Sequence, residues 1–112
     1  MEMQESKSGS SLVISFQGRL DGANSQAAQE RMNAALDRGE TSVLVNMSKL
    51  DYVSSAGLRV FMSAGKRLRA SSGTLAFCEL QDFARELFEI AGFTSLFPVY
   101  NTQGEALQSL GK

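Results

Sequence analysis

The sequence predicts an α/β fold: a single domain with a mainly parallel central sheet of about four or five strands and about four helices. Short apolar segments rich in Val, Ile and Leu alternate along the chain with longer segments whose apolar residues recur at helical spacing. Alternation of this kind is typical of a parallel sheet covered by helices. The length of 112 residues suits one domain that can bury a core without disulfides. We expect this domain to span residues 1–112, with a polar segment over 1–10 that gives a weak indication of a short edge strand.

The first half of the chain contains two predicted strands with a helix between them. Residues 11–16 are rich in Leu, Val and Ile and predict a strand. The following helix begins at Asn24 or Ser25, either of which can cap it, and ends at Gly39. Residues 42–47 are nearly all apolar, as in a strand that is buried on both faces.

The second half continues the alternation. The helix that Asp82 is expected to cap should bury Phe83, Leu87, Ile90 and Ala91, because these residues recur at helical spacing. Pro98 suits a strand at the edge of the sheet. The expected elements are a helix over 55–70, a strand over 74–80, a helix over 82–91, a short strand over 96–100 and a helix over 102–110.

Composition argues against several classes of partner. The chain has 11 basic and 12 acidic residues, so it lacks the positive charge excess that supports direct nucleic-acid binding. Its apolar runs are too short to span a bilayer, and its polar N-terminus does not resemble a signal peptide. We therefore expect no nucleic-acid partner, no membrane association and a cytoplasmic location.

The cysteine and histidine content argues against enzymatic chemistry. The sequence contains no histidine, which removes the commonest general base, the Ser-His-Asp triad and the usual zinc ligand sets. Its one cysteine, Cys78, lies in an apolar segment and is expected to be a buried structural thiol. We expect no catalytic residue, no metal site and no cofactor.

Two adjacent serines, Ser54 and Ser55, stand in the stretch LDYVSSAGLR (residues 50–59), where a strand is expected to give way to a helix. One hydroxyl could cap the helix. The helix N-terminus could hold a phosphate group of a nucleotide, although the chain has neither a G-x-G-x-x-G run nor a P-loop. One serine could instead be the substrate of a kinase, because a phosphate at a helix N-terminus is compatible with the fold.

A phosphoaspartate receiver is a further alternative, since Asp51 lies near a strand end. Receivers need an acidic cluster after the first strand to hold a divalent ion. Residues 17–21 offer one carboxylate and an arginine, which disfavours this alternative. Loops that follow parallel strands lie at the same edge of the sheet, so residues 19–24 and 50–59 could be neighbours there.

Several motifs in order resemble one known family. The chain is similar to STAS domains, specifically those of bacterial anti-sigma factor antagonists, from about residue 12 to residue 110. The motifs that carry the resemblance are GRLD at 18–21, VLVNMS at 43–48, SAGL at 55–58, DFARELF at 82–88 and GFTSLF at 92–97.

The resemblance implies a non-enzymatic regulator that works by partner switching. Such a protein binds an anti-sigma factor that is also a serine kinase, and so frees a sigma factor for transcription. The kinase inactivates the antagonist by phosphorylating a motif serine, and a serine phosphatase reactivates it. The alternative is a constitutive STAS interaction module, never phosphorylated, in another signalling or transport complex. A small nucleotide-dependent α/β enzyme is a third hypothesis.

Alignment on Gly57-Leu58 makes Ser55 the implied phosphoacceptor. Ser54 then occupies the position where the family usually has aspartate, and it is the runner-up acceptor. The second hydroxyl position of the motif is Ala56. The expected partner-binding residues are Asp21, Tyr52, Ser54, Ser55, Gly57, Leu58 and Arg59.

Three of these residues also have a structural interpretation. Leu58 could serve core packing instead of partner contact. Arg59 could meet an acidic partner surface or simply face solvent. Asp21 is expected to shape its loop rather than to perform chemistry.

Overall fold

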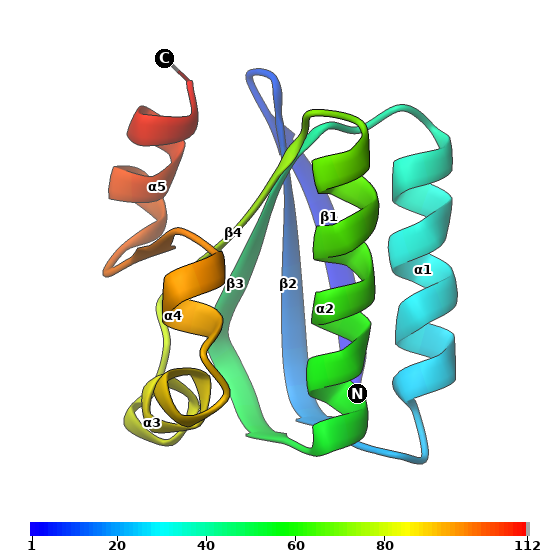
Figure 1. Cartoon of the computed structure of the whole chain (residues 1–112), viewed down its shortest axis with the longest axis vertical. Helices are drawn as coiled ribbons and strands as arrows, with labels where there is room; N and C mark the ends of the chain where they lie inside the picture. Colours follow the sequence, from blue (N-terminus) through cyan, green and yellow to red (C-terminus); the bar gives the residue numbers. More distant parts are fainter. Residues whose placement is uncertain (112) are drawn as a thin grey trace.

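The computed structural model describes residues 1–111 and shows an α/β domain (Figure 1). Strands and helices alternate after an N-terminal hairpin. In chain order the elements are β1 (Glu2–Ser8), β2 (Ser11–Leu20), α1 (Ser25–Asp37), β3 (Ser42–Val53), α2 (Ser55–Ala70), β4 (Thr74–Cys78), α3 (Asp82–Ile90), α4 (Phe93–Leu96), β5 (Val99–Tyr100) and α5 (Gln103–Leu110).

The five strands form one sheet in the order β1-β2-β3-β4-β5. β1 pairs antiparallel with β2, and the other three pairings are parallel. The predicted mainly parallel sheet is therefore confirmed. The short strand β5 lies at an edge, directly after Pro98, as the missing N–H of proline favours.

Helices cover both faces of the sheet. α1 and α2 lie side by side on one face, α3 and α4 close the same core beside them, and α5 lies on the opposite face (Figure 1). The main core contains a chain of phenylalanines in edge-to-face contact, which includes Phe16, Phe61, Phe77 and Phe88. Under α5 a second, smaller cluster contains Val13, Leu44, Ala76, Cys78 and Ala106.

Strands β2 and β3 are longer than the sequence predicts. β2 continues to Leu20 and β3 to Val53, so the predicted loop after residue 16 and part of the stretch 50–59 are strand. The polar residues in these extensions are exposed, whereas Leu20, Leu50 and Val53 remain buried. Register shifts between β2 and β3 also interrupt the simple alternation. A buried-strand pattern therefore cannot be recognised there.

Several local predictions are wrong. Ile90 is 78% exposed and Ala91 is also exposed, while the fully buried residues of α3 are Ala84 and Phe88. Gln81 occupies the N-cap position of α3, so Asp82 is the first helical residue and not the cap. Residues 93–96 form α4, so the predicted strand over 96–100 is reduced to Val99–Tyr100. No side chain caps α1, because the Asn24 amide bonds backward to the loop before it.

Gly65 lets α4 and the segment after it approach α2. A Cβ atom built on Gly65 would lie 2.6 Å from Cζ of Phe97, whose ring is buried against this part of the helix. Any larger residue would have to displace a core aromatic ring. The glycine is therefore a packing requirement within a helix, where its intrinsic propensity is unfavourable.

We expect Gly65→Ala to destabilise the fold by about 1–3 kcal/mol, because the added methyl overpacks the contact with Phe97. Gly104→Ala in α5 is the matched control, since a Cβ there meets only Thr102 Oγ1, at 3.9 Å. The control should be neutral or stabilising by up to about 1 kcal/mol. Urea unfolding followed by circular dichroism measures both. Equal effects of the two substitutions would contradict the packing role of Gly65.

Candidate functional site

The candidate site lies at the end of the sheet where β2 and β3 lead into α1 and α2. We call this region the rim and define it as residues 19–25 and 52–59. Arg19 pairs in register with Tyr52, and Leu20 pairs with Val53. The Ser54 N–H donates to the Leu20 carbonyl at 2.9 Å, which joins the two segments directly after the strands end. The expectation that these segments are neighbours is thus confirmed.

Ser54 is the N-cap of α2. Its backbone is extended, with φ −88° and ψ 174°, and its Oγ accepts a hydrogen bond from the Gly57 N–H at 3.3 Å. Its carbonyl accepts the first helical bond, from the Leu58 N–H at 3.0 Å. The Ser54 side chain is half-buried and engaged. Of the two serines, Ser54 therefore performs the structural task.

Ser55 is the first residue of α2 and is exposed. The first N–H groups of a helix lack intrahelical partners and carry partial positive charge. The first turn of α2 contains no acidic residue that would offset this charge. A negatively charged group on Ser55 would accordingly be stabilised by the helix end.

Gly57 permits the close approach of α2 to the strand ends. A Cβ atom on Gly57 would lie 2.8 Å from Leu20 Cγ, 3.0 Å from the Leu20 carbonyl oxygen and 3.0 Å from Val53 Cγ1. Because one of these atoms belongs to the backbone, a larger residue would shift the start of the helix. The expected role of Gly57 in partner binding is therefore indirect in this geometry: it sets where Ser55 stands.

Arg19 and Tyr52 form the exposed side of the rim. The Arg19 guanidinium carbon lies 4.2 Å from the centroid of the Tyr52 ring, within the range of a cation–π contact. Arg19 Nε also lies 3.8 Å from Asp21 Oδ2. Tyr52 is 40% exposed, one of the few large apolar side chains on the surface of residues 1–111 with such exposure. The pair offers a flat aromatic and cationic surface beside the serines.

Asp21 shapes the loop between β2 and α1. Its Oδ1 accepts the Ala23 N–H at 3.0 Å, and its carbonyl accepts the Ser25 N–H at 2.9 Å. The Asn24 amide completes the turn by bonding the Arg19 carbonyl at 2.7 Å. The structure thus supports the loop-shaping interpretation of Asp21.

Leu58 and Arg59 follow Gly57 on α2. Leu58 is half-buried and packs against the main core, so it joins the interior to the rim. Arg59 is exposed and lines a groove of about 250 Å³ between α1 and α2. The groove is lined by Ser25, Gln26, Gln29, Ala56, Arg59 and Val60.

Sequence reasoning missed Arg19 at the rim and the glutamines of α1 that line the groove beside it. Glutamines on a helix face carry no chemical signal, so only the pairing of α1 with α2 reveals them. Arg19 stands in the GRLD motif, but its position over Tyr52 depends on the unpredicted extension of β2 and β3.

Cys78 lies in the small core under α5, far along the chain from the rim residues. Burial raises the pKa of its thiol to about 12, and the neighbouring Glu79 carboxylate adds to the increase. Within residues 1–111, no group of three or more His, Cys, Asp or Glu side chains is arranged to hold a metal ion. In the same range, each helix is too short or too polar to cross a membrane.

The mainly parallel sheet and its covering helices agree with the family model of the STAS domain, which matches residues 2–106. The chain belongs to this family. It is 41% identical over 106 residues to a protein of Bordetella bronchiseptica provisionally named anti-sigma factor antagonist BtrV, covering 95% of this chain and 91% of that protein. It is 24% identical over 100 residues to the anti-sigma F factor antagonist of Paenibacillus polymyxa, covering 88% and 86%. Its family is therefore that of the anti-sigma factor antagonists, which are regulatory, non-enzymatic proteins.

Solved structures agree with the fold. A crystal structure of an anti-sigma factor antagonist from Mycobacterium paratuberculosis superposes with a TM-score of 0.91 at 18% identity, covering 99% of this chain and 94% of that one. The antagonist SpoIIAA in its unphosphorylated form gives 0.76 at 19% identity, with 97% of both chains covered. The phosphorylated form of Bacillus SpoIIAA gives 0.78 at 20%, covering 97% and 99%.

The two serines should respond differently to removal of the hydroxyl. Ser54→Ala removes the cap of α2 and should cost about 1 kcal/mol of unfolding free energy. Ser55→Ala leaves the cap in place and should change stability by less than about 0.5 kcal/mol. Paired denaturant titrations compare the variants. A larger loss for Ser55→Ala than for Ser54→Ala would refute the assignment of the cap.

The Cys78 thiol should be unreactive in the folded protein and should link stability to alkaline pH. The unfolded thiol ionises near pH 9.0, but the folded one ionises only near pH 12. Its contribution to stability is thus complete below pH 9 and is lost as the pH rises from about 9 to 12, because only the unfolded state releases the proton. Wild type should therefore lose stability relative to Cys78→Ala as the pH rises through this window. Unfolding free energies of the two proteins, measured at several pH values, should converge. A pH-independent difference, or rapid labelling by a thiol reagent at pH 8, would contradict the assignment.

Proposed function

We propose that this protein is an anti-sigma factor antagonist that works by partner switching. Unphosphorylated, it binds an anti-sigma factor that is also a serine kinase and thereby frees a sigma factor. Phosphorylation of Ser55 ends the binding, and a serine phosphatase restores it. The protein acts as a binding partner and a kinase substrate, without catalysis of its own. This function places it in the cytoplasm.

The observation that carries the proposal is the different environment of the two serine side chains. The Ser54 hydroxyl is engaged with the Gly57 N–H, whereas the Ser55 side chain is exposed on the first turn of the same helix. A kinase can reach Ser55 without removing the cap. Phosphorylation of Ser54 would instead have to break the cap hydrogen bond, which makes Ser55 the favoured acceptor.

A phosphate on Ser55 would stabilise the free domain and weaken the complex. It adds about −1.5 to −2 charges at pH 7, at a helix end that attracts anions. Arg59 lies four residues further along α2, on the same helix face, and can pair with the phosphate. A docked partner would have to bury the new charge or approach it with acidic groups, and both are unfavourable.

The docking surface in this proposal is the rim. Tyr52 offers an aromatic face, Leu58 an apolar edge and Arg59 a cation for an acidic partner group. Ser55 lies within four residues of all three in sequence, so the modified residue stands among the contacts that it would control. Gly57 and Asp21 position this surface by packing and by hydrogen bonds.

The names of the similar proteins support the same role. The similar proteins BtrV and the Paenibacillus antagonist both carry the name of anti-sigma factor antagonist. SpoIIAA exists in a phosphorylated and an unphosphorylated form with the same fold class as this chain. A phosphate is therefore compatible with a fold of this type.

The decisive experiment measures binding of Ser55 variants to the cognate anti-sigma factor, identified by co-purification with the tagged wild-type chain from native cells. Ser55→Asp should weaken binding about tenfold or more, because it adds a charge at the interface. Ser55→Ala should bind like wild type and should resist inactivation by the kinase and ATP. Ser63→Asp, also at an exposed position of α2, is the matched control and should leave binding unchanged.

Circular dichroism must show all three variants folded, and mass spectrometry after the kinase reaction should place the phosphate on Ser55. Wild-type affinity of Ser55→Asp together with phosphate on Ser54 would transfer the switch to Ser54. The same affinity without any phosphorylation would favour a constitutive STAS interaction module.

A further inference from the structure

A second surface feature lies on α2, away from the rim, where the helix meets α4. Two adjoining hollows of about 240 and 190 Å³ share the lining residues Gly65, Arg69, Leu96 and Phe97. The smaller hollow also includes Met62 and Lys66. We call this surface the basic groove and define it by residues Met62, Gly65, Lys66, Arg69, Leu96 and Phe97.

The floor of the basic groove is apolar. Gly65 lacks a side chain, so the buried Phe97 ring reaches the helix and the surface is hollowed there. Leu96 is 40% exposed at the edge and is one of four exposed large apolar side chains among residues 1–111. Met62, half-buried, extends the apolar surface along α2.

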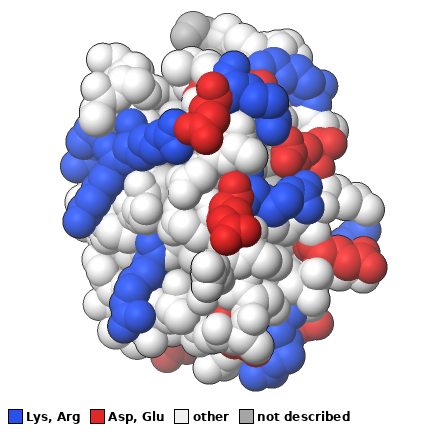
Figure 2. Space-filling model, turned by 90° about the vertical axis from the view of Figure 1, so that its right-hand side faces the viewer, with Lys and Arg blue, Asp and Glu red and all other residues white. Residues whose placement is uncertain are grey.

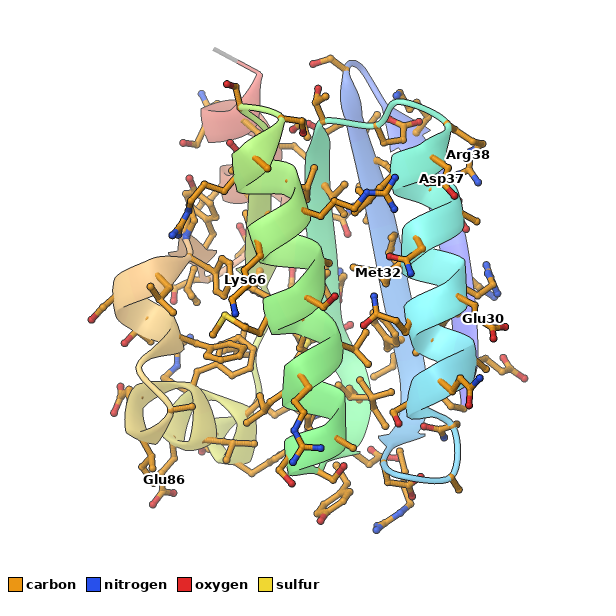
Figure 3. All side chains as sticks on the ribbon, turned by 45° about the vertical axis from the view of Figure 1, so that its right-hand side comes forward. Glu30, Met32, Asp37, Arg38, Lys66 and Glu86 are labelled. Carbon is orange, nitrogen blue, oxygen red and sulfur yellow. The ribbon has the colours of Figure 1, made fainter. Side chains whose placement is uncertain are left out.

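The border of the basic groove is cationic. Lys66 and Arg69 are both exposed, and Figure 3 shows Lys66 on the side of α2 that faces α4. Both hollows are lined without a single acidic residue. The salt bridges among residues 1–111 use other cations, including the neighbouring Arg67, which pairs with Asp37 on the α1 side.

The salt bridges lie elsewhere on the molecule. On the surface formed by β1 and α1, basic and acidic side chains alternate closely, as Figure 2 shows. The Glu5 carboxylate there forms salt bridges with both Arg31 and Arg38. Basic residues near the end of a helix also stabilise its dipole, which accounts for part of the role of Arg69. The helix dipole does not account for an exposed leucine in the same hollow as two cations that take part in none of these salt bridges.

We propose that the basic groove binds an acidic segment of a partner protein, with an apolar side chain seated between Lys66 and Arg69 and carboxylates on either side of it. The charge of the groove selects an acidic ligand, and its apolar floor selects a side chain such as leucine. Lys66 lies eleven residues after Ser55 on α2, about 16 Å along the helix. Binding here is therefore separate from the switch at the rim and persists when Ser55 carries a phosphate.

The probe is a synthetic capped peptide, Gly-Glu-Asp-Leu-Glu-Asp-Gly, titrated into ¹⁵N-labelled full-length protein. Amide shifts should change at Gly65, Lys66, Arg69 and Leu96, and the affinity should fall with added salt. Two control peptides, one with lysine at every acidic position and one with serine in place of leucine, should bind more weakly.

Charge reversal of the groove tests the proposal on the protein side. Lys66→Glu/Arg69→Glu should weaken binding of the acidic peptide roughly tenfold, because it replaces two attractive contacts by repulsion. Lys49→Glu, which reverses an exposed cation on β3, is the matched control and should have little effect. Ser55→Asp should leave peptide binding unchanged, which separates this groove from the rim.

The proposal is overturned if the acidic peptide does not bind, if its shifts map outside the basic groove, or if the double charge reversal leaves its affinity unchanged.

Sedimentation of the free protein tests whether a second copy of the chain occupies the groove instead. Ile90 is 78% exposed and follows Glu86 and Glu89, so a second copy of the chain presents an acidic and apolar segment of its own. Self-association abolished by Ile90→Ser and by the groove variant would replace the partner protein with a second copy.

Discussion

The hydrogen bond from the Ser54 N–H to the Leu20 carbonyl is the constraint on which the rim depends. It extends the parallel pairing of β2 and β3 to the last residue before α2, so that two segments far apart in sequence end together. Gly57 then packs on Leu20 at a distance that excludes any larger side chain. As a result, the start of α2 is fixed by strand pairing on one side and by close packing on the other, and Ser55 has a defined position before any partner binds.

The same helix connects the rim to the rest of the molecule. The stability of α2 comes from its buried residues, including Phe61, Ala64 and Leu68, and not from its exposed first turn. A change of charge at Ser55 therefore leaves the helix in place. Near the other end, Gly65 accommodates Phe97 and creates the basic groove. Two glycines thus shape two surfaces on a single helix, and the helix holds Ser55 of the rim about 16 Å from Lys66 of the basic groove.

The sequence predicts the interior better than the rim, for a physical reason. Residues 42–47 are recognised as strand because both of their faces are buried, whereas Leu50 and Val53 alternate irregularly with exposed residues across a register shift. Ile90 fits the helical spacing of α3, yet a nine-residue helix at the border of the core buries only a narrow stripe. The serines are found from the motif, but residue type alone does not show which hydroxyl caps the helix. That assignment needs the backbone angles and the hydrogen bond to Gly57.

The serine at position 54 also affects the electrostatics of the proposed switch. In the family pattern that this chain resembles, an aspartate usually stands there, and it would place a carboxylate next to a phosphate on the following residue. Ser54 caps the helix with a neutral hydroxyl instead, and the first turn of α2 contains no acidic residue. A phosphate on Ser55 would therefore meet the helix dipole and Arg59 without an adjacent like charge in that turn. This arrangement would stabilise the free phosphorylated domain. The net charge of the rim would change from nearly neutral to anionic, and a docked partner would respond to that change.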